Sequence, residues 1–209
     1  MRTDASLPLP SGGLYAISDG PRADLLVACE AALRGGAALL QYRDKSRDDA
    51  RRRAEAGALA TLCARFRVPL IVNDDVELAA EVQAGVHLGA QDPGLAAARV
   101  RLGPQAIIGA SCYDSIERAR ALAAAGADYL AFGAFFPSPT KPLARRAEPG
   151  LLRQARALGR PLVAIGGITP DNAPALVAAG ANFVAVVSGL FGTGDPERAA
   201  RRYAALFTK

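Results

Sequence analysis

Two cations and an amide stand at the end of a short apolar run at residues 38–43, in the order Gln41-Tyr42-Arg43-Asp44-Lys45. If this run is a strand, the alternation of side chains places Gln41, Arg43 and Lys45 on one face. An arginine offers a planar fork to phosphate oxygens, and a lysine adds a compact positive charge. The segment therefore predicts a diphosphate-binding site, with an ordinary surface turn as the alternative.

Carboxylates follow the next two apolar runs, at Asn73-Asp74-Asp75 and at Asp92. In proteins Mg²⁺ commonly takes one or two carboxylates and fills its other positions with water and substrate phosphate. We therefore expect Asp74 and Asp92 to hold Mg²⁺ together. Asp75 can instead cap the following helix, and Asp92-Pro93 can begin one.

Hydroxyls, a lysine and glycines follow the later apolar runs. Ser111 closes one run, Ser138-Pro139-Thr140-Lys141 lies in a proline-rich loop, and the last two runs end in Gly166-Gly167 and Val187-Ser188-Gly189. Glycine lets the backbone approach a ligand closely, and backbone N–H groups in such turns bind phosphate. These segments predict a further phosphate site, although each could be only a rigid turn.

His87 is the only histidine of the chain and lies within an apolar run. We expect it to be a packed, hydrogen-bonded residue rather than a catalytic base. The chain therefore offers no Ser-His-Asp or Cys-His system, and a metal site with several histidines is excluded. The chemistry must rely on charged groups.

Eight apolar runs have the length and composition of strands and alternate with Ala/Leu/Arg-rich stretches of helical spacing. The predicted strands are residues 14–18, 38–43, 69–73, 85–89, 107–112, 129–136, 161–167 and 183–189. Predicted helices include residues 23–34, 48–66, 115–125 and 195–207, with Asp114 and Asp195 as caps and a further helix opening at Pro170-Asp171-Asn172. The pattern predicts a single-domain (β/α)8 TIM barrel, since the Gly-x-Gly-x-x-Gly turn of an open doubly wound sheet is missing. In such a barrel the polar residues that follow the strands meet at one end.

Residues 125–131 and 179–185 echo one another, because each segment ends a predicted helix with glycine and enters a strand. Repetition of this kind favours a barrel.

Length and composition fit one globular domain spanning residues 1–209, with residues 1–12 as a flexible N-terminal extension. The formal charge is +5, but the basic residues are spread over helices, which argues against nucleic-acid binding. No apolar run is long enough to span a membrane. The three cysteines are unclustered, which fits a reducing cytoplasm.

In combination these motifs resemble the thiamine phosphate synthase family. The resemblance runs from Leu14 to Phe207 and rests on Gln-x-Arg-x-Lys at 41–45, Val-Asn-Asp-Asp at 72–75, His-Leu-Gly at 87–89, Gly-x-Ser at 109–111, Thr-Lys at 140–141 and Ala-Ile-Gly-Gly-Ile at 164–168. It implies a transferase that joins 4-amino-2-methyl-5-(diphosphooxymethyl)pyrimidine to 4-methyl-5-(2-phosphoethyl)thiazole and releases diphosphate. The implied mechanism is dissociative.

The resemblance also implies which residues bind each substrate. The pyrimidine diphosphate would contact Gln41, Tyr42, Arg43, Asp44, Lys45, Asn73, Ser111 and Lys141, with Mg²⁺ on Asp74 and Asp92. The thiazole phosphate would contact Ser138, Pro139, Thr140, Gly167, Val187 and Ser188. Arg43, Lys45, Ser111 and Lys141 would be the catalytic residues, because they face the leaving group.

Departures from the family pattern leave two alternatives open. Ala90, Gln91, Tyr113 and Ser138 stand where the family commonly has other residues. A thiazole tautomerase, a close relative, uses a histidine where this chain has Ala134, although Ser188-Gly189-Leu190-Phe191 and Arg201-Arg202-Tyr203 are similar to the tautomerase group. A non-catalytic barrel that binds phosphometabolites is the second alternative. The expected partners are small-molecule substrates, and a homo-oligomer stays open.

Overall fold

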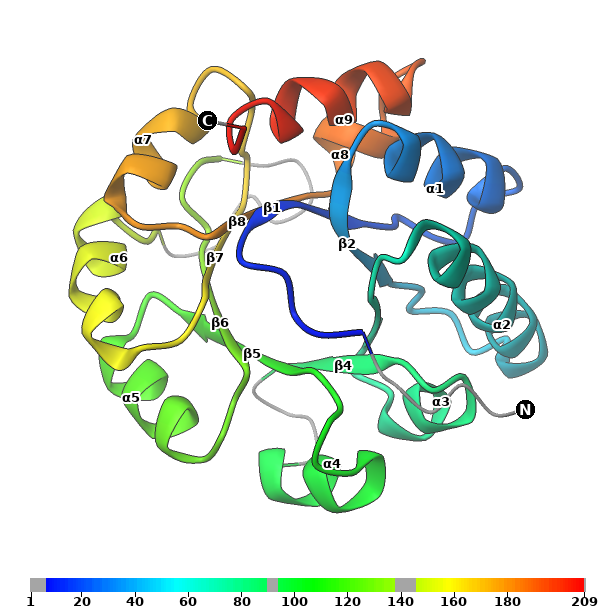
Figure 1. Cartoon of the computed structure of the whole chain (residues 1–209), viewed down its shortest axis with the longest axis horizontal. Helices are drawn as coiled ribbons and strands as arrows, with labels where there is room; N and C mark the ends of the chain where they lie inside the picture. Colours follow the sequence, from blue (N-terminus) through cyan, green and yellow to red (C-terminus); the bar gives the residue numbers. More distant parts are fainter. Residues whose placement is uncertain (1–6, 90–93, 138–145, 209) are drawn as a thin grey trace.

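A computed structural model describes residues 7–89, 94–137 and 146–208. Eight parallel strands close into a barrel in chain order, and the helices form a ring around it (Figure 1). The strands are β1 (Gly13–Ile17), β2 (Ala37–Tyr42), β3 (Leu70–Asn73), β4 (Gly85–Leu88), β5 (Ile108–Tyr113), β6 (Tyr129–Phe132), β7 (Leu162–Ile165) and β8 (Phe183–Val186). The predicted TIM barrel is confirmed.

The helices that follow the strands bury their apolar faces against the outside of the barrel. They are α1 (Leu25–Arg34), α2 (Asp49–Phe66), α3 (Val76–Glu81), α4 (Leu95–Leu102), α5 (Ile116–Ala124), α6 (Pro149–Ala155), the 3₁₀ turn η1 (Arg156–Leu158), α7 (Ala173–Ala179), α8 (Ser188–Phe191) and α9 (Pro196–Ala204). Within the described ranges, no helix is both long and apolar enough to cross a membrane.

Side chains alternate along each strand between two separate apolar clusters. On β1, Leu14 and Ala16 join the outer cluster between strands and helices, whereas Tyr15 and Ile17 point into the barrel. The inner cluster consists of Tyr15, Ile17, Leu39, Ile71, Ile107, Tyr129, Ala131, Val163, Phe183 and Ala185. Strands buried on both faces explain why the runs in the sequence are continuously apolar.

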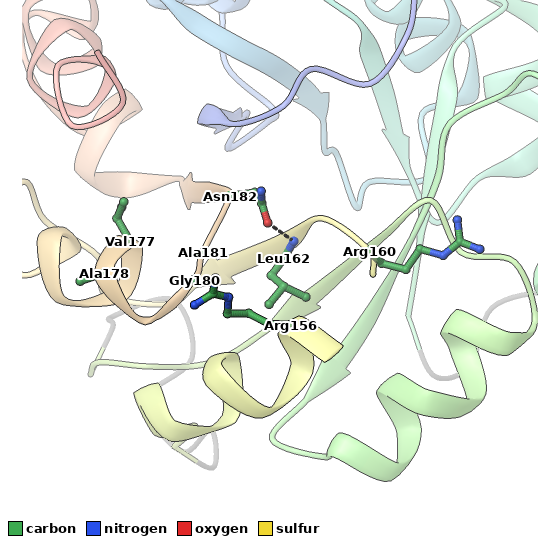
Figure 2. Close-up of a pocket in the computed structure, with 8 residues that line it drawn as sticks. All are labelled: Arg156, Arg160, Leu162, Val177, Ala178, Gly180, Ala181 and Asn182. Carbon is green, nitrogen blue, oxygen red and sulfur yellow. Dashed lines mark hydrogen bonds between the residues drawn. The ribbon is translucent and has the colours of Figure 1, made fainter. Parts of the chain in front are cut away.

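The two echoing segments form the same corner between a helix and a strand. Gly126 and Gly180 both have a positive φ and end their turns. In each segment the side chain of the polar residue two positions later forms a hydrogen bond with the backbone of the preceding strand. The side chain of Asp128 accepts a hydrogen bond from the Ile108 N–H at 2.7 Å. Asn182 accepts one in the same way from the Leu162 N–H at 2.9 Å (Figure 2). The repeat in the sequence is therefore a repeat in structure.

The amino end of the barrel is covered by the chain that leads into β1 (Figure 1). Residues 7–12, predicted as part of a flexible extension, include Leu9, which packs against the inner cluster. The side chain of Asn182 donates to the carbonyl of Ser11 at 3.2 Å. Beside Asn182 lies a shallow hollow of about 450 Å³ next to Arg156 and Gly180 (Figure 2).

The predicted helix starts are correct in one case and wrong by one residue in another. Asp195 caps α9 by accepting from the Arg198 N–H at 3.0 Å. Asp114 does not cap α5, because the hydroxyl of Ser115 accepts from the Arg118 N–H instead. Either side chain is a favoured cap, so the sequence alone does not separate neighbours.

Strands β6, β7 and β8 are shorter than predicted, because the residues after them leave the sheet to form the barrel's carboxyl end. Gly166 and Gly167 have φ values of 105° and 62°. Val187 caps α8, which begins at Ser188. These backbone turns are the segments that the sequence marked as phosphate sites.

Gly109 on β5 is required by the ring of Tyr129. A Cβ atom at this position would lie 1.8 Å from Cζ of Tyr129. Because this ring is fully buried, we expect Gly109→Ala to destabilise the protein by about 3 kcal/mol or more, measured by urea unfolding. Gly57→Ala is the matched control: a Cβ atom at Gly57 in α2 meets nothing within 4 Å, so its stability should be unchanged or slightly higher. Equal stability of the two variants would contradict this packing argument.

Candidate active site

A cavity of about 740 Å³ opens at the carboxyl ends of the strands. It brings together predicted residues that lie more than a hundred positions apart in the sequence. Those that line it are Gln41, Arg43, Lys45, Asn73, Asp74, Ser111, Gly167, Val187 and Ser188. The cavity therefore brings these nine predicted residues to one end of the barrel.

Tyr42 and Asp44, which were predicted to bind substrate, direct their side chains to the other face of β2. The hydroxyl of Tyr42 donates to Glu55 in α2 at 2.7 Å. Oδ2 of Asp44 lies 2.9 Å from Nη2 of Arg51 as an ion pair without hydrogen-bond geometry. Although burial opposes it, the hydrogen bonds from Ser46 and the charge of Arg51 lower the pKa of Asp44. Both side chains hold the strand against α2.

Five predicted residues lie outside the described part of the chain. They are Asp92, which was predicted to be the second metal ligand, and the loop residues Ser138, Pro139, Thr140 and Lys141.

The cationic side of the cavity is carried by the end of β2. Ser18, fully buried after β1, accepts a hydrogen bond from the Arg43 N–H at 2.8 Å and so fixes the backbone there. The ammonium of Lys45 lies 3.5 Å from Oδ2 of Asp74, and the Lys45 side chain is 61% exposed. An ammonium this exposed can move from Asp74 to an anionic ligand at little cost.

The two neighbouring acids after β3 have different tasks. Asp75 caps α3 by accepting from the Leu78 N–H at 2.9 Å and pairs with Arg52 at 2.7 Å. Asp74 has a φ of 64°, a conformation that an aspartate tolerates better than most residues, and its N–H donates to the carbonyl of His87. This turn directs Asp74 into the cavity and leaves Asp75 as part of the scaffold.

A continuous hydrogen-bonded chain crosses the inside of the barrel below the cavity. Nε2 of Gln41 donates to Oη of Tyr15 at 2.7 Å, and the hydroxyls of Tyr15 and Tyr129 lie 2.8 Å apart. Oη of Tyr129 is 3.0 Å from Nδ1 of His87, and Nε2 of His87 is 2.9 Å from Oγ of Ser111. The expectation that His87 is packed and hydrogen-bonded is confirmed. The same ring also lines the cavity.

Arg118 is a cavity residue that the sequence reasoning missed. Its guanidinium donates to the carbonyls of Ser111 at 2.7 Å and Gly89 at 3.2 Å, and it lies over the ring of Tyr113 at 5.6 Å. It stands in the first turn of α5, where the helix dipole disfavours a cation. A basic residue at that position was the signal available in the sequence.

The residues that line the cavity after β7 and β8 carry no charged side chain, so backbone groups form much of this part of the cavity. The amide of Asn172 donates to the carbonyl of Gly167, and the buried hydroxyl of Tyr203 donates to that of Ile168. A Cβ atom on Gly167 would lie 2.3 Å from the carbonyl oxygen of Pro137, so this turn needs glycine. These contacts hold the turn after β7 in place.

Cysteine chemistry has no place in this site. All three cysteines are free and buried, and burial raises the pKa of each thiol to about 12. The thiolate that a nucleophile or a metal ligand requires is therefore disfavoured.

Comparisons with known proteins identify the family of this chain. A sequence model of the family described as thiamine monophosphate synthase matches residues 14–190. The thiamine-phosphate synthase of Thioalkalivibrio sulfidiphilus is 57% identical over 200 residues, which cover 93% of this chain and 95% of that protein. The thiamine-phosphate synthase of Xanthomonas campestris is 55% identical over 199 residues, with 94% and 96% covered.

A solved structure extends the likeness to the fold. The thiamine phosphate pyrophosphorylase of Pyrococcus furiosus superimposes with a TM-score of 0.85 at 32% identity, covering 94% of this chain and 95% of that one. Sequence and structure agree over nearly the full length, so the chain belongs to the thiamine monophosphate synthase family.

Proposed function

We propose that the cavity joins 4-amino-2-methyl-5-(diphosphooxymethyl)pyrimidine to 4-methyl-5-(2-phosphoethyl)thiazole, which yields thiamine phosphate and diphosphate. The observation that carries this assignment is the division of the cavity. Arg43, Lys45 and Asp74 follow β2 and β3, whereas the backbone turns at Gly167 and Ser188 follow β7 and β8. One side suits a diphosphate with its cation, and the other suits a single phosphate held by N–H groups.

The reaction needs a leaving group to be stabilised and needs no general base. The C–O bond between the pyrimidine methylene and the diphosphate breaks, and both electrons leave with the diphosphate. The electron-rich aminopyrimidine stabilises the resulting cation. The lone pair of the thiazole nitrogen then forms the new C–N bond.

The described residues have roles that follow from their positions. Arg43 and Lys45 would bind the departing diphosphate, and Ser111 would donate a hydrogen bond to it from β5. Gln41 and Asn73 would orient the pyrimidine portion. Because these groups are fixed before reaction, they stabilise the developing charge without reorganising.

Mg²⁺ fits the donor set at Asp74. Among the residues that the structure describes, no three His, Cys, Asp or Glu side chains cluster as a metal cage. Asp74 supplies a carboxylate that lines the cavity, and Mg²⁺ usually takes one or two carboxylates and completes its shell with water and substrate phosphate. Asp74 and Asp92 would hold the ion, which would neutralise charge on the diphosphate.

Neither alternative function is supported by the relatives. The curated relatives that match over most of the chain are named synthases. The tautomerase histidine is replaced by Ala134, which lines the cavity. A non-catalytic barrel could have lost the cationic groups that bind the leaving group, but they are present in this chain.

One further property belongs to the proposal. We place the reaction in the cytoplasm, which the three free thiols support.

The test is diphosphate release by the purified protein with both substrates, with Mg²⁺ and with chelator. We expect diphosphate and thiamine phosphate in equal amounts with Mg²⁺, and neither with chelator. Conversion of a thiazole isomer without diphosphate would identify a tautomerase. Binding of both substrates with no product would identify a non-catalytic barrel.

A further inference from the structure

The number of available protons limits which group can donate at each link of the hydrogen-bonded chain between Gln41 and Ser111. The chain has four links, between Gln41 and Tyr15, Tyr15 and Tyr129, Tyr129 and His87, and His87 and Ser111. Each link holds one proton. Burial raises the pKa of both Tyr15 and Tyr129, so both phenols keep their protons.

The amide of Gln41 sets the direction of every bond in the chain. Since it donates to Tyr15, the proton of Tyr15 must point to Tyr129, and that of Tyr129 must point to His87. Nδ1 of His87 then accepts, so a neutral imidazole carries its proton on Nε2 and donates it to Ser111. The proton of Ser111 is then not used within the chain, and Ser111 lines the cavity, so this proton is available to a ligand there.

We propose that Tyr15, Tyr129 and His87 are positioning residues that make the Ser111 hydroxyl a dedicated donor toward the cavity. This direction suits an anion, because phosphate oxygens accept hydrogen bonds and a serine lone pair would repel them. With the opposite direction, Ser111 would give its proton to His87 and face the anion with a lone pair. The role of Ser111 toward substrate rests on the proposed function, whereas the tautomer of His87 does not.

The aromatic rings of the chain pack on one another, so a tyrosine hydroxyl can be removed by substitution without loss of the ring. The ring of Tyr129 stacks on the ring of His87, with centroids 5.6 Å apart. The ring of Tyr15 contacts the ring of Tyr129 edge-on, with centroids 5.9 Å apart. Phenylalanine keeps these ring contacts. Tyr129→Phe therefore cuts the chain in the middle while its packing is retained.

The single histidine makes the tautomer directly measurable. In protein labelled with ¹⁵N-histidine, NMR at about pH 8 should show Nε2 protonated and Nδ1 unprotonated. Tyr129→Phe should produce a mixture of tautomers. Gln41→Leu should do so too, although Gln41 reaches His87 only through both tyrosines.

Tyr203→Phe is the matched control, because it removes another buried phenol that bonds to the carbonyl of Ile168 outside the chain. It should leave the tautomer unchanged. Protonation on Nδ1 in the unmodified protein would overturn the proposed direction. An unchanged tautomer in Gln41→Leu would overturn the coupling.

A kinetic cycle tests the consequence for Ser111. Tyr129→Phe should lower kcat/KM for the pyrimidine diphosphate about tenfold in the otherwise unmodified enzyme and less than about twofold in a Ser111→Ala background, since interacting residues are not additive. Equal losses in both backgrounds would show that Tyr129 does not act through Ser111. If the unmodified protein releases no diphosphate, the proposed function fails, and the NMR result still decides the tautomer.

Discussion

Asp74→Ala should lower kcat for diphosphate release by about 10³-fold at saturating Mg²⁺, comparable to the loss of a preorganised group that stabilises transition-state charge. Asp74 is the described carboxylate that the turn after β3 directs into the cavity, with Lys45 3.5 Å away. Alanine removes the anion that would hold Mg²⁺ against the diphosphate. The measurement is steady-state diphosphate release over a Mg²⁺ titration.

The neighbouring acid is the control for this substitution. Asp75→Ala removes the cap of α3 and the ion pair with Arg52. It should cost about 1 kcal/mol of stability and leave kcat within a few-fold of the unmodified enzyme. If the two variants lost equal activity, or if Asp74→Ala kept normal turnover, Asp74 would not be the metal ligand.

Arg43→Lys should lower kcat/KM for the pyrimidine diphosphate by about 10²-fold although the charge is conserved. Only arginine presents two parallel N–H donors to phosphate oxygens, and the backbone of Arg43 is already fixed by Ser18. A lysine at this site keeps the charge attraction to the diphosphate but cannot present two parallel N–H donors to its oxygens. The loss should appear with the diphosphate substrate and not in the KM for the thiazole phosphate.

The exposed Arg47 on the same loop provides the control. Arg47→Lys should change neither kinetic constant by more than about twofold, because an exposed charge contributes little. A similar small effect of Arg43→Lys would mean that Arg43 acts only as a diffuse charge.

Much of the fold was predictable because its signals are local. Continuous apolar strands, helical spacing between them and glycine turns each occupy a few neighbouring residues, and the closed barrel follows from eight such units. Alternation along β2 also predicted that Gln41, Arg43 and Lys45 share a face. The same rule places Tyr42 and Asp44 on the other face, where the structure has them, although the family resemblance had grouped all five.

The hydrogen-bonded chain was not predictable, because it depends on barrel closure. Tyr15 and Tyr129 come from β1 and β6, and in sequence each is one more apolar strand residue. Their hydroxyls meet only because both strands point them inward, and Gly109 leaves room for the ring of Tyr129. Likewise, Arg118 reaches the cavity from a helix whose cap the sequence placed one residue too early.

The most direct test of the shared anion and metal pocket is a crystal structure of the protein with Mn²⁺ and inorganic diphosphate. The account predicts an anomalous peak within about 2.3 Å of an Asp74 carboxylate oxygen, with diphosphate bridging that metal to Arg43. Metal bound at the amino end of the barrel, or diphosphate bound away from Arg43, would contradict the account.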